Sequence, residues 1–181
     1  MNLGISSETR TLSPGVYCGG LVVSGSSHVT FRPGVYVMKD GPLEVTHTST
    51  ITGENVGFYL TGDQAVFLFA GGSTVELTAP TDGPLAGLLF FEDRSNPAGR
   101  YHEIVSENAR KLVGTIYLPK GNFAVSSKTP VADQSAYTAI VANTIQLNKY
   151  PVLVLNSDYE LTDVPVPSGL GTKGGSVFLT N

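Results

Sequence analysis

The residues of this chain that could carry chemistry are few and scattered. Its three histidines, His28, His47 and His102, stand alone, with no second histidine or cysteine at a spacing that would let two side chains share a metal ion. Cys18 is the only cysteine, and it lies in a glycine-rich segment with no identifiable base to activate its thiol. The sequence therefore predicts no metal site, no bound cofactor and no nucleophilic catalysis.

Paired carboxylates are the remaining route to catalysis, because hydrolysis of a glycosidic bond needs two of them about 5 to 9.5 Å apart. Four aspartates lie beside glycine, glutamine or other turn residues, namely Asp40, Asp63, Asp82 and Asp133. Aspartate is favoured there for bonding to its own backbone. Glu92 and Asp93 are adjacent, but neighbours on a strand point to opposite faces. We expect a non-enzymatic protein, with a polysaccharide-binding or polysaccharide-cleaving β-helix as one alternative.

A run of alternating threonines is the sharpest pattern for binding, and it consists of Thr46, Thr48, Thr50 and Thr52. Alternate residues of a strand share one face, so the run predicts four hydroxyls in a row. Threonine suits any exposed pleat because it is β-branched. A flat threonine array also resembles that of ice-binding β-solenoids, which gives a second alternative function. The array would be only one strand wide, because neighbouring strands offer no further ranks of threonine.

Charge is densest at residues 92–111, with 8 charged residues in 20 positions against 18 in the other 161. We expect this segment to leave the regular structure as an excursion, with a short helix within residues 102–112 as the only helical pattern in the chain. Arginine and tyrosine are enriched at interface hot spots. The segment thus predicts a partner-binding surface that consists of Arg94, Arg100, Tyr101 and Arg110. A solvated loop that joins two coils is the alternative.

The amino-acid composition indicates the fold class in which these candidate residues lie. Charged residues make up only 14% of the chain, against about 25% in typical domains, while 21 glycines and 11 prolines indicate frequent turns. The net charge of −4, with no cluster of lysine and arginine, argues against nucleic-acid binding. The longest apolar runs, such as residues 65–70, fall far short of the roughly 18 residues of a membrane span. These features predict an all-β protein.

An internal repeat identifies the architecture. Residues 12–17 recur nineteen positions later as residues 31–36, each copy with a Pro-Gly pair followed by Val-Tyr. Proline and glycine suit the two central positions of a type II turn, so each copy predicts a turn that leads into a strand. Looser copies follow at steps of 23, 30, 28 and 24 residues, with two further short strands in each step. Short strands cannot bury their faces alone, but stacked coils can.

The sequence therefore predicts a parallel β-solenoid of about six coils, with the Pro-Gly turns stacked at one corner. An antiparallel β-sandwich is the alternative, and it would need two-residue Asp-Gly turns between strands. Both Asp-Gly pairs, at residues 40–41 and 82–83, are followed by proline, which cannot donate to a returning strand. We expect one domain over residues 1–181, with a lead-in at 1–11. Residues 163–181 should form an extended tail that caps one solenoid end or adds a strand to a neighbour.

Several ordered motifs in residues 11–167 resemble the C-terminal region of TadG-like proteins of the Tad (tight adherence, Flp) pilus assembly system. These motifs are Pro14-Gly15-Val16-Tyr17-Cys18-Gly19-Gly20, Pro33-Gly34-Val35-Tyr36, Asp40-Gly41-Pro42-Leu43, Tyr59-Leu60-Thr61-Gly62, Leu77-Thr78-Ala79-Pro80, Gly114-Thr115-Ile116-Tyr117-Leu118-Pro119 and Ala139-Ile140-Val141-Ala142.

The resemblance implies a periplasmic or extracellular adhesion domain that is attached to the membrane through an anchor segment absent from this chain. It implies protein partners within a pilus or envelope assembly, with surface glycans as further candidates. It supplies no catalytic motif.

Overall fold

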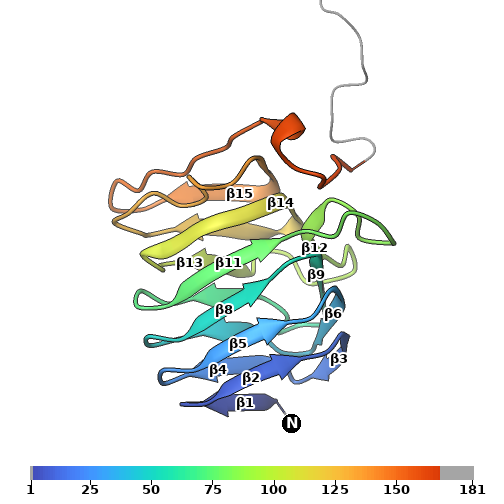
Figure 1. Cartoon of the computed structure of the whole chain (residues 1–181), viewed down its shortest axis with the longest axis vertical. Helices are drawn as coiled ribbons and strands as arrows, with labels where there is room; N and C mark the ends of the chain where they lie inside the picture. The colour runs from blue at the N-terminus through green and yellow to red at the C-terminus, as the bar shows by residue number, and fades with distance from the viewer. Residues whose placement is uncertain (1, 168–181) are drawn as a thin grey trace, which may run out of the picture.

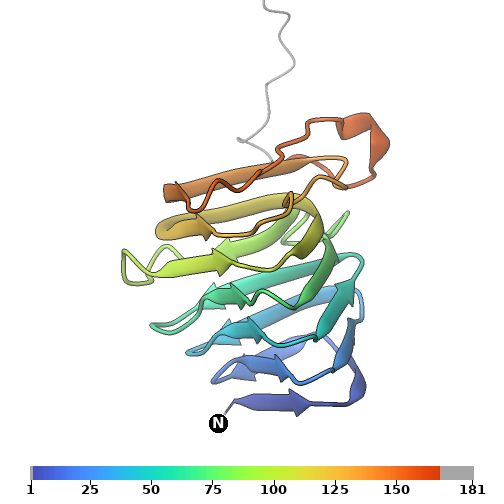
Figure 2. The same cartoon turned by 90° about the vertical axis from the view of Figure 1, so that its left-hand side faces the viewer.

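Strands of successive coils pair in parallel, so that three faces build up around a common interior. The computed structural model describes residues 2–167 and is an all-β solenoid of about seven coils (Figures 1 and 2). Every strand pairing is parallel except one isolated antiparallel bridge between Tyr137 and Ser157. The predicted solenoid is confirmed, and the antiparallel sandwich is not what the chain forms.

The strands fall on three faces. The first face has β1 (Leu3–Ser6), β4 (Leu21–Ser24), β7 (Leu43–Val45), β10 (Phe67–Phe69) and β13 (Tyr101–Ile104). The second has β2 (Thr9–Leu12), β5 (His28–Phe31), β8 (Thr50–Gly53) and β11 (Thr74–Thr78). The third has β3 (Gly15–Cys18), β6 (Gly34–Lys39), β9 (Val56–Thr61) and β12 (Leu88–Glu92). Two long strands, β14 (Asn108–Val125) and β15 (Thr138–Leu147), bend around corners and contribute to more than one face.

The interior is built from ladders of apolar side chains, one from each coil. On the first face one ladder runs through Ile5, Val23, Val45, Phe69, Ile104, Val125 and Leu147. Beneath the third face, the buried Phe58 ring lies 5.5 Å from Tyr36 and 5.2 Å from Phe90, centroid to centroid, and is stacked on both. Such stacking lets strands of three to six residues bury apolar area that none could bury alone.

Several expectations about individual segments were wrong. About seven coils form, compared with the expected number of about six, because β1 and most of β2 lie within the segment that was expected to be a lead-in. The short helix within residues 102–112 is absent, and β13 and the start of β14 take its place. Within residues 92–111, the excursion from the stack is limited to residues 93–100, since Glu92 ends one strand and Tyr101 begins the next. The helical content of residues 2–167 is the three-residue η1 (Tyr159–Leu161), so no helix there could span a bilayer.

The two Pro-Gly pairs stack at one corner, as predicted, but not as type II turns. A Cβ atom on Gly34 would collide with the Pro14 ring of the coil below, so the close approach of the two coils requires glycine there. The φ angle of Gly34 is +135°, whereas the third residue of a type II turn has about +80°. The pair therefore bends the chain directly into a strand.

Candidate functional site

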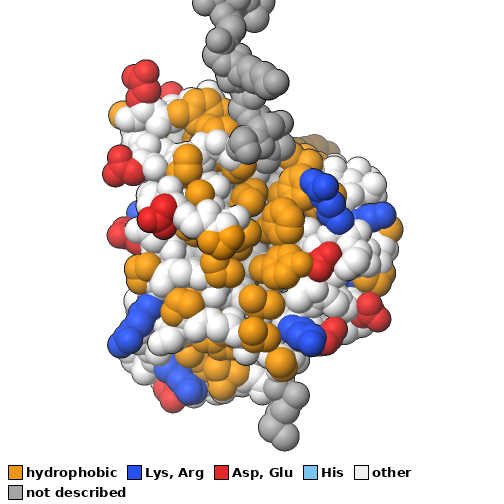
Figure 3. All heavy atoms as spheres, turned by 90° about the vertical axis from the view of Figure 1, so that its right-hand side faces the viewer, with side chains coloured by type: hydrophobic (Ala, Val, Ile, Leu, Met, Phe, Trp, Pro, Cys, Tyr) orange, Lys and Arg blue, Asp and Glu red, His pale blue; other side chains and the backbone are white. Residues whose placement is uncertain are grey.

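An aromatic stripe runs along the outside of the third face. It is one outward position followed from coil to coil through Val16, Val37, Tyr59, Phe91, Tyr117 and Val141. Outward residues of an exposed strand are ordinarily polar, yet all six here are apolar or aromatic. Figure 3 shows hydrophobic side chains gathered in a band along this face. The stripe is therefore a continuous apolar feature spanning six coils.

The aromatic rings at the centre of the stripe stack on one another. The centroids of Tyr59 and Phe91 are 5.7 Å apart, and those of Phe91 and Tyr117 are 5.3 Å apart with only 16° between the ring planes. Each is half-buried by its neighbours. Because the ring faces cover each other, the stripe presents mainly ring edges and the hydroxyls of two tyrosines.

Two charges of opposite sign flank this centre. The hydroxyl of Tyr59 donates to Asp93 Oδ2 at 2.5 Å, and Thr61 donates to the same oxygen at 3.1 Å. These contacts, led by the Tyr59 bond and joined by bonds from Ser95, lower the pKa of Asp93 to about 2. The Arg94 guanidinium donates twice to the Tyr117 hydroxyl, at 3.1 and 2.8 Å, and its central carbon lies 5.5 Å from the centre of that ring. Both charges are held in place by stripe residues.

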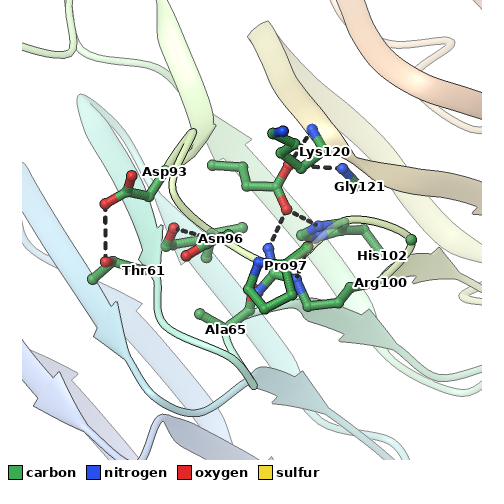
Figure 4. A network of polar contacts seen from close by, with 12 residues as sticks. Thr61, Ala65, Asp93, Asn96, Pro97, Arg100, His102, Lys120 and Gly121 are labelled. Atoms are coloured by element: carbon green, nitrogen blue, oxygen red, sulfur yellow. Dashed lines mark hydrogen bonds and ion pairs between the residues drawn. The ribbon is translucent and has the colours of Figure 1, made fainter.

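Between the end of β12 on the third face and β13 on the first lies a buried ionic corner formed by Glu92, Arg100 and His102. Figure 4 shows Arg100 and His102 close together in this corner. Glu92 and His102 are fully buried, and the Arg100 side chain is 12% exposed. Arg100 Nη2 pairs with Glu92 Oε1, and His102 Nε2 lies 3.5 Å from the same oxygen. The backbone N–H groups of Lys120 and Gly121 donate to Glu92 Oε2 at 2.9 and 2.8 Å.

The corner ties together three segments that are far apart in sequence. Arg100 also donates to the carbonyls of Gly62, at 2.8 Å, and Ala65, at 3.2 Å. Asn96 accepts from the Gly62 N–H at 2.8 Å and donates to the Leu60 carbonyl at 2.9 Å. Both carboxylate oxygens of Glu92 are occupied by donors, and the group has no contact with solvent. The arrangement anchors the loop at residues 93–100 and leaves no free lone pair on Glu92 for acid–base chemistry.

The protonation states follow from these contacts. Burial lowers the pKa of His102 below its ordinary 6.5, and this outweighs the opposing effect of its bond to Glu92. The neutral ring is thus the folded form, with Nδ1 placed to accept from the Phe67 N–H at 3.4 Å. Burial by itself raises the pKa of Glu92, but the bonds from His102 and Lys120 and the charges nearby lower it overall, below its ordinary 4.5.

Stability should therefore fall on acidification. As the pH falls through about 6.5, the unfolded chain takes up a proton at His102 that the folded chain does not, so the free energy of unfolding decreases. Glu92 acts in the same direction, because its contribution is present above about pH 4.5 and is lost as the pH falls through its lower folded pKa. Urea unfolding at pH 8, 7, 6 and 5 measures this. A His102→Phe variant should show a flatter profile between pH 7 and 5, and an equal slope in both proteins would contradict the assignment.

The four residues predicted to form a partner-binding surface do not come together. Arg94 flanks the stripe on the third face, while Arg100 is turned into the ionic corner. Tyr101 is 50% exposed on the first face, and Arg110 pairs with Asp133 on the second, its Nε 2.9 Å from Oδ1. These four residues do not form one continuous surface, because most of residues 92–111 are strand or corner and their side chains diverge around the solenoid.

The predicted row of four threonines is also broken. Thr46 and Thr48 lie in the corner before β8, where His47 has a left-handed φ of +58°, and each donates to a backbone carbonyl of the coil below. Only Thr50 and Thr52 lie on the strand. Their neighbours are nevertheless threonines: six of eight outward positions over four coils of the second face are threonine, namely Thr9, Thr11, Thr30, Thr50, Thr52 and Thr74, with His28 and Glu76 as the others. We call this grid the threonine ladder.

The remaining reactive residues stay apart. Cys18 is a free, exposed thiol at the end of β3. Within residues 2–167, no three histidine, cysteine or carboxylate side chains are grouped in a way that could hold a metal ion. Glu92 points inward and Asp93 lies at the surface, so this adjacent pair does not converge on a common point. The aromatic stripe, with Asp93 and Arg94, is the feature best placed to act on another molecule.

Comparison of the chain with protein-family models, with curated proteins and with solved structures finds no match.

Proposed function

We propose that this chain is a non-catalytic scaffold that binds a protein partner along the aromatic stripe during assembly of a Tad-type pilus at the cell envelope. The observation that carries the proposal is the unbroken outward row from Val16 to Val141. Interfaces combine aromatic and arginine anchors with a polar rim. Here Phe91 and Tyr117 supply the anchors, and Arg94 and Asp93 supply the rim.

The ring geometry favours a protein over a glycan as the partner. Sugars bind aromatic residues through the flat face of a ring, whereas Phe91 and Tyr117 cover each other's faces at 16°. An extended strip of ring edges, branched aliphatic groups and two held charges suits a protein surface of matching shape. The link to pilus assembly rests on the ordered motifs that resemble TadG-like proteins, and so does the proposed location outside the cytoplasm.

Replacing Phe91 with serine in the native host should abolish most partner binding while leaving the domain folded. Truncating a central interface anchor costs about 2 kcal/mol, or about 30-fold in affinity. We expect the strain to lose surface attachment and assembled pili. Val22→Ser is the matched control, since Val22 is a half-buried outward residue on the first face. Normal attachment by the Phe91→Ser strain, with the protein present at its usual level, would refute the proposal.

A second candidate function rests on the threonine ladder. Strands in a sheet lie about 4.8 Å apart and alternate residues about 6.7 Å apart, so the six threonines of the ladder repeat at regular spacings, interrupted by His28 and Glu76. Thr52 and Thr30 lie within hydrogen-bonding reach across adjacent coils, at 3.4 Å. Such a grid can order water in a lattice that matches ice.

Thermal hysteresis and ice recrystallisation measure this second function directly. The wild-type chain should show activity, Thr52→Tyr should lose most of it by breaking the flat grid, and Val22→Tyr on another face should keep it. Absence of hysteresis in the wild-type chain would eliminate the candidate.

A further inference from the structure

The two ends of the solenoid are built differently. At the first coil, Arg10 occupies a position that is filled by buried Val29, Ile51 and Val75 in the coils above. Its side chain is exposed and lies 3.7 Å from Glu8. A charge at an inward position of an edge strand opposes pairing with another strand. The first coil is thus protected against further stacking by its own sequence.

The last coil has the opposite character. Of the nine large hydrophobic residues that are exposed in residues 2–167, seven lie within residues 145–161. Ile145 and Leu147 continue two interior ladders, from Phe123 and Val125 respectively, yet they are 48% and 54% exposed. They are core positions without a cover among the described residues.

The backbone at this end is open as well. Within the described chain, β15 pairs with β14 alone, so the other edge of residues 144–147 presents unpaired N–H and C=O groups. An apolar, uncharged sheet edge of this kind is a template for one more strand. Repeat proteins commonly close such an end with a dedicated capping element.

The chain supplies a candidate for that strand. It is already fastened near this end by buried Val164 and by the Tyr137 hydroxyl, which donates to the Pro165 carbonyl at 2.9 Å. A spacer with four glycines in residues 168–175 then leads to Ser176-Val177-Phe178-Leu179-Thr180. In an extended chain Val177 and Leu179 share one face, at the same spacing as Ile145 and Leu147. Eight spacer residues can reach about 27 Å, which is nearly the length of β15.

We propose that residues 176–180 add to the free edge of β15 as a capping strand, with Val177 and Leu179 over Ile145 and Leu147. The cap completes the two interior ladders and removes the exposed apolar end. It is independent of the aromatic stripe, so either proposal can fail without the other.

Disulfide trapping tests the cap in the full-length chain. In a Cys18→Ser background, which removes the only native thiol, Ile145→Cys and Val177→Cys are combined and exposed to a mild oxidant. Mass spectrometry of the monomer should show most of the protein with an intramolecular disulfide. The control pair Val22→Cys with Val177→Cys should show little, because Val22 lies on the second strand of the first face. Absence of the bond, or bonds only between two molecules, would overturn the proposal, and the latter result would assign the end to a second copy.

Hydrogen exchange gives a readout that does not depend on cysteine. In a Val177→Ser/Leu179→Ser variant, amides of residues 144–147 should exchange at least about ten-fold faster than in the wild type, while those of β4 should be unchanged. Equal exchange rates in the two proteins would also overturn the cap.

Discussion

Replacing Arg100 with methionine is expected to lower the free energy of unfolding by about 3 to 5 kcal/mol. Methionine fills much of the same space but removes the guanidinium that pairs with Glu92, which is fully buried. It also removes the guanidinium donor from the carbonyls of Gly62 and Ala65. Urea unfolding followed by circular dichroism measures the loss.

A double variant separates the buried charge from the lost packing. Glu92→Gln with Arg100→Met removes both charges, while the glutamine oxygen can still accept from Lys120 or Gly121. We expect the double variant to be more stable than Arg100→Met alone, because no uncompensated charge remains in the corner. A loss below about 1 kcal/mol for Arg100→Met would show that the pair is solvated like a surface salt bridge.

Replacing Phe90 with alanine is expected to have the second large effect, and to lower the free energy of unfolding by about 3 to 5 kcal/mol. Its ring is fully buried, lies 5.2 Å from Phe58 and 4.4 Å from Phe67, and fills the centre of the interior. Truncation would leave a cavity that the stacked coils cannot close, because each is fixed by its neighbours on both sides.

Phe91→Ala is the matched control for Phe90→Ala. The two residues are adjacent, identical in type and on opposite faces of β12, so the difference between them reports only the side of the sheet. We expect Phe91→Ala to lower the free energy of unfolding by about 1 kcal/mol, which is within the ordinary range for a partly exposed site. Equal losses for the two variants would contradict the inward and outward assignment on which the stripe depends.

The sequence predicted the architecture because the signals for it are local and repeated. The Pro-Gly-Val-Tyr pair at residues 14–17 and 33–36 marked a corner, and prolines after both Asp-Gly pairs argued against hairpins. Coil number was harder to predict, because β14 runs through three faces as one continuous 18-residue strand, with Gly114, Pro119 and Gly121 inside the strand and not in separate turns. Residues 168–181 of the expected tail lie outside the described residues.

The aromatic stripe was missed through a register shift of one residue. Tyr17, Tyr36 and Tyr59 look equivalent in the repeat, but Tyr36 is buried and pairs with Phe58, whereas Tyr59 is outward and pairs with Val37. A shift of one position moves a side chain to the opposite face of a strand. The outward positions that correspond to Tyr59 are occupied by Val16 and Val37, and only the strand pairing shows that these three residues are in line.

The ionic corner could not be predicted from the sequence, for a different reason. Arg100 lies in the most charged part of the chain, which predicts exposure, but its partners include carbonyls 35 and 38 residues away. Burial of Glu92 likewise depends on backbone donors at Lys120 and Gly121, 28 and 29 residues later. Contacts of this range are set by the stacking of coils, which no local pattern encodes. The threonine ladder was missed for the same reason, since its ranks are joined across coils.

Site-specific photocrosslinking tests the proposed docking role of the stripe most directly. A benzoylphenylalanine is placed at position 91 of the full-length protein in the native host, and the same group is placed at position 22 on the first face as the control. Position 91 should yield a discrete crosslinked species containing a pilus-assembly protein, identified by mass spectrometry, and position 22 should not. No crosslink from position 91, or the same species at equal yield from both positions, would contradict the proposed docking role.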